Sequence, residues 1–464
     1  MSNYDLVIIG GGPGGYVAAI RGAQNKMKVA LVEKEHLGGV CLNWGCIPTK
    51  ALLKCSELNH SFHRAGEYGF QVKDVKYDFE KIMGRSRKVA DQLSSGISHL
   101  LKKNNVTVLN GEGKILSGKK VAVNFPGKKE EVLSAKNIII ATGSRARILP
   151  GLEPDGKLIM SYRDALALKD IPKNLLVVGS GAIGIEFASF YRNMGSEVSI
   201  VEMQDKVLPI EDTEVSQFLK ADLVGQGIKI HVNSKVSAIE KVKQGVKVML
   251  DIAGDKKTQD FDSVFVAAGI QSNVENIGLE NTKVKLDRGH IATNLWCETD
   301  DPGIYAIGDV AAPPWLAHKA SHEGIICVDR IAGKKDIKPL NRRAIPSCIY
   351  SIPQVASVGL TEREAIKQGY KIKIGKFPFV GNGKAIAIGE TSGFVKTIFD
   401  EKTGELLGAH MVGAEVTEMI QGYVIAMTLE ATEQELMHTI FPHPTLSEIM
   451  QESVLHAFDK SIHI

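Results

Sequence analysis

The chain has 464 residues, 44% of them hydrophobic, and a net charge of +3 at neutral pH. This length predicts about three domains, and the small, mixed charge argues against a nucleic-acid or membrane-binding protein. No apolar stretch reaches the ~18 residues that a membrane-spanning helix needs. The N-terminus starts directly with a strand and shows no targeting segment, so we expect a cytoplasmic protein.

The first elements predict a nucleotide-binding unit. An apolar strand over 4–9 is followed by a helical run over 16–24 and by a second strand over 29–32 that leads to Glu33. Between the first strand and the helix lie the glycines of a G-x-G-x-x-G motif, Gly10, Gly12 and Gly15. In this context the glycines let a pyrophosphate approach the helix N-terminus, and the carboxylate accepts hydrogen bonds from a ribose.

A close cysteine pair, Cys41 and Cys46, comes next. Five positions of regular helix would give ~7.5 Å of rise and about 140° of rotation. A disulfide needs Cα atoms within ~7 Å, so we expect the segment to be bent. Gly38, Gly39 and Gly45 permit the bend, and Pro48 suits the first turn of a following helix. Cys46 would then lie near a helix N-terminus, which favours a thiolate.

A bridge between Cys41 and Cys46 would close too small a ring to stabilise the fold much, so we predict a redox-active disulfide. Half of a zinc site and two inert thiols are the alternatives. No second close cysteine or Cys/His pair stands out, and we expect no metal. We interpret the other four cysteines as small buried apolar side chains; they are Cys55, Cys297, Cys327 and Cys348.

The same nucleotide-binding pattern recurs at a constant offset of 169 residues. A strand over 175–178 precedes a helical run over 185–194, and a strand over 198–201 leads to Glu202. The glycines of this second copy are Gly179, Gly181 and Gly184. Two copies with the same context make a ligand-free glycine turn a poor interpretation.

Further strands suggest how the two units are connected. The strand over 138–140 runs into Ala-Thr-Gly, the strand over 264–266 runs into Ala-Ala-Gly, and the strand over 304–307 leads to Asp309. We therefore expect one nucleotide-binding domain inserted into another. From about 341 short β-rich runs alternate with turns, and a helix over 415–429 is apolar almost all round. It would be buried in a third domain or in a subunit interface.

Taken together, the motifs resemble those of the flavin disulfide oxidoreductases over essentially the whole chain. They are Gly-Gly-Gly-Pro-Gly-Gly-Tyr at 10–16, the Cys41–Lys50 motif, Ala-Thr-Gly-Ser at 141–144, Gly-Ser-Gly-Ala-Ile-Gly-Ile-Glu at 179–186, Ala-Ile-Gly-Asp at 306–309 and His-Pro-Thr-Leu-Ser-Glu at 443–448.

The resemblance implies an α/β fold with two Rossmann-like dinucleotide-binding domains, one inserted in the other, and a C-terminal α+β dimerisation domain. The implied limits are 1–143 for the first part of the FAD domain, 144–269 for the NAD domain, 270–340 for the central second part of the FAD domain and 341–464 for the interface domain. The implied cofactors are FAD and NAD.

The resemblance also implies cofactor-binding residues. Around FAD they are Gly10, Gly12, Pro13, Gly14, Gly15, Glu33, Lys34, Gly39, Val40, Cys41, Lys50, Gly113, Thr142, Gly143, Ser144, Gly308, Asp309, Leu316, Ala317 and His318. In and around the second unit they are Gly179, Gly181, Ala182, Ile183, Gly184, Glu186, Glu202, Val236 and Gly269.

The resemblance assigns Cys46 to the flavin and Cys41 to the substrate. Lys50 would lie near the flavin's reactive nitrogen and pair with Glu186. His443 would be the acid/base, oriented by Glu448 and reaching the disulfide of the partner subunit, which implies a homodimer with shared active sites.

The residues themselves support the choice of His443 among the 13 histidines. Pro442 and Pro444 restrict its backbone, and a histidine with a carboxylate partner suits proton transfer near neutral pH. His318 is the second candidate, and its alternative interpretation is packing beside the cofactor.

Glu202 favours NAD over NADP, because a carboxylate accepts from a free ribose 2′-hydroxyl and repels a 2′-phosphate. This disfavours the NADP-linked glutathione reductases, and the lack of any cysteine after Cys348 disfavours members with C-terminal cysteines. Within the family, the resemblance implies oxidation of a dihydrolipoyl group on the acyltransferase subunit of a 2-oxo acid dehydrogenase complex. Another NAD(P)H-dependent disulfide reductase and a non-catalytic assembly subunit stay as alternatives. The segment 269–273 lacks the family's usual Arg and Pro.

Overall fold

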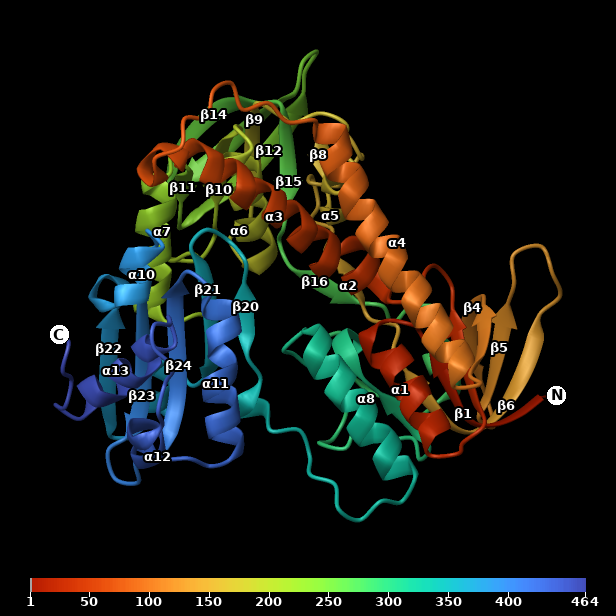
Figure 1. Cartoon of the computed structure of the whole chain (residues 1–464). Helices are drawn as coiled ribbons and strands as arrows, with labels where there is room; N and C mark the ends of the chain where they lie inside the picture. Colours follow the sequence, from red (N-terminus) through yellow and green to blue (C-terminus); the bar gives the residue numbers. More distant parts are fainter. Residues whose placement is uncertain (1) are drawn as a thin grey trace. The chain divides into compact units, whose positions relative to one another are not determined.

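The structure is a computed structural model that describes residues 2–464 (Figure 1). Its chain divides into two compact units. The first comprises residues 1–51, 80–147 and 269–340, and the second comprises residues 52–79, 148–268 and 341–464. The four domain limits expected from the sequence are finer than this division and stay a prediction.

A seven-stranded mixed sheet forms the centre of the first unit. Its strands in spatial order are β3 (Thr107–Asn110), β2 (Val29–Glu33), β1 (Ser2–Ile9), β6 (Glu131–Ile140), β5 (Lys120–Asn124) and β4 (Glu112–Leu116), with β19 (Ile304–Ala306) also paired to β6. The strands β3, β2, β1, β6 and β19 run parallel to one another, whereas β5 pairs antiparallel with both β6 and β4. Because β1 is apolar on both faces, hydrophobic clusters form on each side of it.

The first unit also contains helices and two small two-stranded sheets. The helices are α1 (Pro13–Gln24), α2 (Gly39–Trp44), the start of α3 (Cys46–His63), α4 (Phe79–Lys103) and α8 (Ala317–Ile331). The two-stranded pairs are β7 (Ser144–Ala146) with β16 (Ile270–Ser272), and β17 (Leu286–Asp287) with β18 (His290–Ile291).

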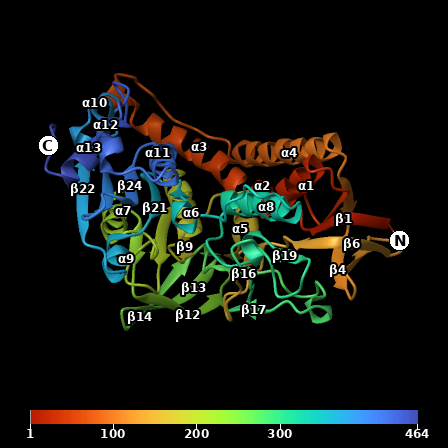
Figure 2. The same ribbon diagram turned by 90° about the horizontal axis from the view of Figure 1, so that it is seen from below.

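Helices α1 and α8 lie side by side in both views (Figures 1 and 2). Glycine makes this close approach possible, since a Cβ on Gly324 of α8 would lie 2.8 Å from the carbonyl oxygen of Gly14 on α1. Farther along, Arg21 of α1 binds Asp329 of α8 through two bonds of 2.8 and 2.7 Å. Small residues therefore set the helix distance, and a bidentate ion pair fixes the register.

The second unit contains a five-stranded parallel sheet and a three-stranded antiparallel sheet. The parallel order is β11 (Lys229–His231), β10 (Glu197–Val201), β9 (Asn174–Val178), β15 (Ser263–Val266) and β8 (Ile159–Met160). The antiparallel order is β12 (Ser234–Lys241), β13 (Val246–Ile252) and β14 (Asp255–Phe261). The helices of this part are α5 (Tyr162–Ala165), α6 (Ala182–Asn193) and α7 (Thr213–Gly225).

A five-stranded antiparallel sheet carries the C-terminal part of the second unit (Figure 2). Its order is β20 (Ser347–Ile349), β21 (Gln354–Gly359), β24 (Leu406–Gly413), β23 (Phe394–Asp400) and β22 (Ile372–Pro378). The helices here are α9 (Glu362–Lys367), α10 (Gly383–Ala387), α11 (Val416–Thr428), α12 (Glu433–His438) and α13 (Glu448–Ala457).

Helix α11 is the apolar helix expected from the sequence. One face, including Met419, Ile420 and Tyr423, is buried against the sheet. Ile425 on the same helix is 51% exposed. The helix is therefore buried along one face within this chain and leaves apolar surface on another.

The predicted internal repeat is confirmed at the level of secondary structure. Helices α1 and α6 begin and end at positions that differ by the same 169 residues, and β1 and β9 end at matching positions. Each helix follows a parallel strand across a glycine turn. Within residues 2–464 the structure contains no helix with the length and apolar character required to span a bilayer.

Candidate redox and nucleotide-binding sites

The first glycine loop has no room for side chains at two of its three motif positions. Gly10 has φ +107°, and a Cβ there would lie 2.2 Å from the carbonyl oxygen of Ala141. A Cβ on Gly15 would lie 1.8 Å from the carbonyl oxygen of Gly10. Gly12 stands at the helix start without a side-chain cap, so the first N–H groups of α1 remain available to an anion.

Glu33 is held beside this loop. One carboxylate oxygen accepts from the backbone N–H of Gly11 at 2.6 Å, and the other accepts from Glu35 N–H at 2.7 Å. Each oxygen keeps a further lone pair for a ribose hydroxyl. Lys34 instead extends outward, where its Nζ lies 3.6 Å from a carboxylate oxygen of Glu112.

The second glycine loop repeats this geometry. Gly179 has φ +100°, and a Cβ on Gly184 would lie 2.0 Å from its carbonyl oxygen. Glu202 accepts from the N–H and the hydroxyl of Ser180, both at 2.8 Å, and from Gln204 N–H at 2.8 Å. The two carboxylates are thus held by backbone groups at equivalent positions of the repeat.

Both loops fit a dinucleotide. No heavy atom outside the adjacent chain lies within 4 Å of a Cβ built on Gly181 of the second loop, or on Gly143, which follows β6. At Gly12 the nearest such atom is the Cα of Gly39, 3.9 Å away. Open space, uncapped helix starts and an anchored carboxylate are the features that pyrophosphate and ribose require.

The cysteine pair lies across a break between two helices. Cys41 is in α2, and α3 begins at Cys46. Gly45 between them has φ −138° and ψ −116°, which no helix contains. The predicted bend and the predicted helix start near Cys46 are both confirmed, although Cys41 lies in a short helix of its own.

The two sulfurs are in contact as reduced thiols. The hydrogen bond with the Cys46 side chain, together with burial, raises the pKa of the Cys41 thiol well above its usual range. The charge of Lys50 acts in the opposite direction, so Lys50 is close enough to influence the pair. In the reduced pair, burial and the neighbouring thiol therefore favour the protonated form of Cys41.

Helix α4 holds both cysteine-bearing helices, a contact that the sequence did not predict. Arg87 stacks over the Trp44 ring at 4.7 Å and donates to the carbonyl oxygen of Asn43 at 2.7 Å. Ser86 donates to the carbonyl oxygen of Pro48 at 3.1 Å. Because α4 contacts the end of one helix and the start of the next, it fixes the break between them.

Asp309 follows β19 in a short 3₁₀ turn. Its carboxylate accepts from the Ser144 hydroxyl at 2.8 Å, and its carbonyl oxygen accepts from Ser272 at 2.8 Å. Burial raises the pKa of Asp309 despite that hydrogen bond and the nearby charge of Lys319. The structure thus brings together two predicted cofactor residues, Ser144 and Asp309, that are far apart in sequence.

A buried ion pair on α8 supports the Asp309 turn. Lys319 lies 2.8 Å from a carboxylate oxygen of Glu323 and donates to the carbonyl oxygen of Ala312 at 2.8 Å. The other oxygen of Glu323 accepts from Gly308 N–H at 2.8 Å. Leu316, Ala317 and His318 form the start of the same helix. Apart from the i, i+4 spacing of Lys319 and Glu323, no pattern of residues indicated this pair.

The atypical segment 269–273 pairs with the strand that carries Ser144. Asn273 donates from its side chain to the carbonyl oxygen of Thr142 at 2.9 Å, and the Thr142 hydroxyl donates to the carbonyl oxygen of Asn273 at 2.7 Å. Arg145 of β7 donates to the Asn273 side chain at 2.9 Å. An arginine of the neighbouring strand thus contacts this segment.

The remaining predicted residues are distributed over both units. Gly113 on β4 leaves room for the ends of β1 and β2, since a Cβ there would lie 3.1 Å from Ile9. Val236 lies at a register shift of β12. Glu186 on α6 is 5% exposed and accepts from Tyr350 N–H at 3.0 Å. Its predicted pairing with Lys50 joins the two units and stays a prediction.

His443 and Glu448 interact as expected. The Nδ1 atom of His443 lies 2.9 Å from one carboxylate oxygen of Glu448, and the other oxygen accepts from Thr445 N–H at 2.9 Å. Burial opposes ionisation of Glu448, but the hydrogen bonds from Thr445 and His443 outweigh it and lower its pKa. The His443 side chain is 77% exposed and so accessible to a reacting group.

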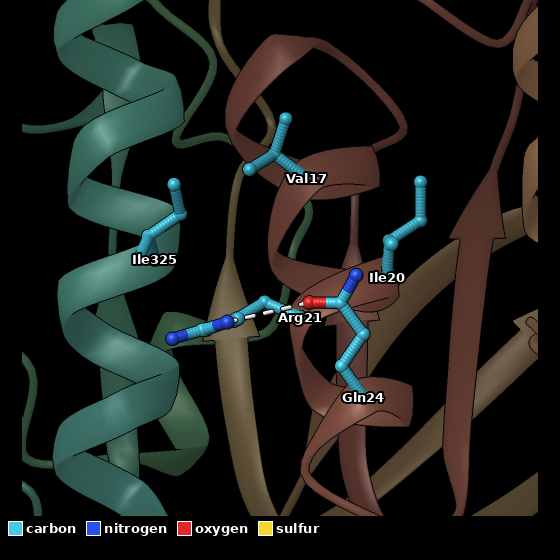
Figure 3. Close-up of a pocket in the computed structure, with 5 residues that line it drawn as sticks. All are labelled: Val17, Ile20, Arg21, Gln24 and Ile325. Carbon is cyan, nitrogen blue, oxygen red and sulfur yellow. Dashed lines mark hydrogen bonds between the residues drawn. The ribbon is translucent and has the colours of Figure 1, made fainter.

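A cavity of about 430 Å³ lies beside α1 and α8, and Figure 3 shows the residues that line it. It is lined by Val17, Ile20, Arg21, Gln24 and Ile325. None of these residues belongs to the predicted sites, and no ligand is assigned to it. Among residues 2–464 no cluster of three or more His, Cys, Asp or Glu side chains could hold a metal ion.

The fold and these sites define a class of protein. Residues 4–324 match the family model of pyridine nucleotide-disulphide oxidoreductases, and residues 345–454 match that family's dimerisation domain. The chain belongs to this family, which confirms the predicted fold class and the two cofactors, FAD and NAD.

Relatives with narrower descriptions match along the whole chain. A dihydrolipoyl dehydrogenase from Zymomonas mobilis is 54% identical over 462 residues, covering 99% of each chain. One from Rhizobium etli is 50% identical over 478 residues, again covering 99% of each chain. Among solved structures, LpdA from Mycobacterium tuberculosis superposes with a TM-score of 0.91 at 27% identity, covering 98% of this chain and 99% of that one.

Proposed function

We propose that this chain oxidises protein-bound dihydrolipoamide to lipoamide and reduces NAD⁺ to NADH, using Cys41 and Cys46 as its redox pair. The observation that carries the proposal is the thiol contact across the helix break, in the unit that also holds the first glycine loop. The full-length similarity to dihydrolipoyl dehydrogenases supports the choice of substrate.

The two sulfurs have different roles in this proposal. A substrate thiolate attacks the sulfur of Cys41, a mixed disulfide forms, and Cys46 leaves as a thiolate. The second substrate thiol then attacks its partner sulfur, which closes the lipoyl disulfide and releases Cys41. The raised pKa of Cys41 agrees with the product of these steps, in which Cys41 is a protonated thiol.

His443 is the acid/base of the proposed reaction. Its Nδ1 atom is engaged by Glu448, so Nε2 is the atom that faces a substrate thiol and removes its proton. Glu448 is held ionised by the bonds that lower its pKa and stabilises the imidazolium that results. In the proposed homodimer with shared active sites, His443 acts on the disulfide across the subunit interface.

Bound FAD would accept the electron pair from the thiols and deliver a hydride to NAD⁺. The chain's own part is to hold the cofactors: the Gly10–Gly15 loop and Glu33 bind one dinucleotide, and the Gly179–Gly184 loop and Glu202 bind the other. Glu202 favours NAD over NADP because a carboxylate beside the ribose accepts from a free 2′-hydroxyl and repels a 2′-phosphate. Lys50 and Glu186 complete the proposed active site.

We also propose partners and a cellular location for the protein. The family dimerisation domain supports a homodimer, and the exposed apolar side of α11 gives it contact surface. A lipoyl-bearing acyltransferase of a 2-oxo acid dehydrogenase complex is the proposed larger partner. A cytoplasmic location is also proposed.

Paired assays test the substrate. The first measures NADH formation from dihydrolipoamide and NAD⁺, and the second measures NADPH consumption with glutathione disulfide. We expect turnover in the first and background in the second. The reverse result would favour a glutathione-reductase-like enzyme, and no turnover with any dithiol or disulfide would favour an assembly subunit.

An anaerobic titration with one equivalent of NADH tests the cysteine pair. We expect a long-wavelength absorption from a thiolate beside the flavin, present in the intact protein and lost in Cys46→Ser. Simple bleaching of the intact protein would mean that the pair does not exchange electrons with the cofactor.

A further inference from the structure

The first unit contains a second pair of cysteines that the proposed reaction does not use. Cys297 lies in the segment before β19, and Cys327 lies on α8. Their side chains share one hydrophobic cluster, and their exposed fractions are 4% and 0%. Both residues are buried, as expected from the sequence, and their side chains also meet.

The backbone directs Cys297 towards α8. Its N–H donates to the carbonyl oxygen of Asn294 at 3.1 Å, and its carbonyl oxygen accepts from Ala306 N–H at 3.0 Å. Its φ of +65° is a conformation that few non-glycine residues adopt. Such a conformation persists where surrounding contacts enforce it, so the position of the thiol is set by the fold.

The Cys297 thiol reaches the helical turn that holds Cys327. Its Sγ atom lies 3.9 Å from the carbonyl oxygen of Glu323, four residues before Cys327 on α8. The side chains of Cys297 and Cys327 also interact directly with each other. The fold thus places two sulfurs in contact from segments separated by β19 and the Asp309 turn.

The surroundings decide which reagents could reach the pair. Burial, followed by the contact with Cys297 and the charges of Glu323 and Glu298, raises the pKa of Cys327 far above its usual range. A protein thiol or a charged oxidant would have to enter a closed apolar core. A small uncharged oxidant has the best access, and it would meet the slightly exposed Cys297 first.

We propose that Cys297 and Cys327 are a second oxidisable site, which a small uncharged peroxide converts into an intramolecular disulfide. The sulfur of Cys297 attacks a peroxide oxygen and the O–O bond breaks. Cys297 becomes a sulfenic acid, and one water is released. The sulfur of Cys327 then attacks the sulfenic sulfur, the S–S bond forms, and its proton leaves with the hydroxide as a second water. Two thiols lose two electrons, and one hydrogen peroxide becomes two waters.

The crosslink would act on the segment that carries Asp309. Between Cys297 and Cys327 the chain contains β19, the Asp309 turn and the start of α8, which together form a loop of about 30 residues. Closing a loop of this length restricts the unfolded chain far more than the small ring of Cys41 and Cys46. The disulfide would therefore stabilise the first unit, and its burial would protect it from exchange with thiols in solution.

The test uses the full chain with Cys41→Ser and Cys46→Ser, so that the catalytic pair contributes no disulfide. The protein is treated with hydrogen peroxide, quenched with catalase, alkylated under denaturing conditions and mapped by mass spectrometry without reduction. We expect a peptide crosslinked through Cys297 and Cys327, with Cys55 and Cys348 alkylated. Over-oxidised single cysteines without this crosslink would overturn the proposal.

Single variants in the wild-type background test the stabilisation. Oxidised protein should unfold at a temperature about 5 °C or more above the reduced protein. Cys297→Ser and Cys327→Ser should abolish both crosslink and shift and leave turnover unchanged, whereas Cys55→Ser should keep both. A crosslink without a rise in the unfolding temperature would refute the stabilising role. If a serine variant does not fold, Cys297→Ala replaces it. The crosslink in the wild-type protein and its loss in Cys297→Ala then decide whether the disulfide forms.

Discussion

The two nucleotide-binding units share one frame but differ in how the chain continues beyond it. In both, a glutamate at the end of the second strand is anchored by the N–H of the second loop residue, Gly11 in the first unit and Ser180 in the second. In the first unit the chain then folds back over the loop, and a Cβ on Gly39 would lie 2.8 Å from the Cα of Gly12. Gly181, the equivalent of Gly12, faces open space.

This difference shows how one supersecondary unit can serve two kinds of ligand. In the proposed function, the overlaid loop would keep FAD bound, and the open loop would let NAD exchange. In the first unit the overlying segment is also the start of α2, which carries Cys41. In the proposed function, the fold-back that overlies the first loop would therefore also bring the redox pair to the flavin.

The largest expected effect separates the two glycine loops. Gly12→Val should fill the narrow space beside Gly39, so the protein should be isolated without FAD and without activity. Gly181→Val should keep FAD and its reduction by dihydrolipoamide, while KM for NAD⁺ rises at least ~10-fold. Flavin absorbance and the two half-reactions measure both variants. Loss of FAD from Gly181→Val would break the assignment of the two units.

The redox pair belongs to the first unit alone. Cys46→Ser should lower turnover with dihydrolipoamide by a factor on the order of 10⁴ or more while FAD stays bound, because no disulfide remains to accept electrons. Cys55→Ser, on the same helix α3, is the matched control and should keep turnover. Substantial dithiol oxidation by Cys46→Ser would contradict the proposed mechanism.

The two glutamates should respond differently although their local contacts match. Glu202→Ala removes a charged acceptor beside the NAD ribose, so KM for NAD⁺ should rise ~10-fold or more and the preference over NADP⁺ should fall. Glu33→Ala should speed the release of FAD without changing KM for NAD⁺. Steady-state kinetics and flavin dissociation rates distinguish these outcomes. An effect of Glu33→Ala on NAD⁺ binding alone would reverse the assignment.

A smaller effect concerns the stabilisation of helix α1 compared with helix α6, and it should depend on pH. Burial opposes ionisation of Asp329, but its bonds to Arg21, Asn25 and Lys334 outweigh it and lower its pKa to about 2. Because this pKa is depressed by folding, the stabilisation is present above about pH 4 and is lost as the pH falls towards 2. In α6, Arg192 instead binds the carbonyl oxygen of Gln226 at 2.6 Å.

Asp329→Asn should therefore lower the temperature of flavin release by a few degrees at pH 6 and by less at pH 3. Flavin fluorescence during heating follows the release. Asp170 in the second unit is exposed. Asp170→Asn is therefore the control and should show no such pH-dependent difference. An equal deficit at both pH values would mean that Asp329 stabilises α1 through packing rather than charge.

Much of the site could be predicted because its signals are local in sequence. Gly10 and Gly15 are needed where a strand turns directly into a helix, and their role depends on backbone space that any side chain would fill. The bend between Cys41 and Cys46 follows from the mismatch of helix geometry with a disulfide. His443 and Glu448 are separated by a single turn, so their contact required no knowledge of the fold.

The sequence by itself determined the repeated glycine loops, their carboxylates, the redox pair and the family to which they point. Only the tertiary structure decided which distant residues support them: Ser144 with Asp309, Thr142 with Asn273, and Cys297 with Cys327. Each of these contacts depends on the pairing of β6 with β19, of β7 with β16, or on the packing of α8. Strand register and helix packing result from burying the whole core at once, and no local pattern of residues encodes them.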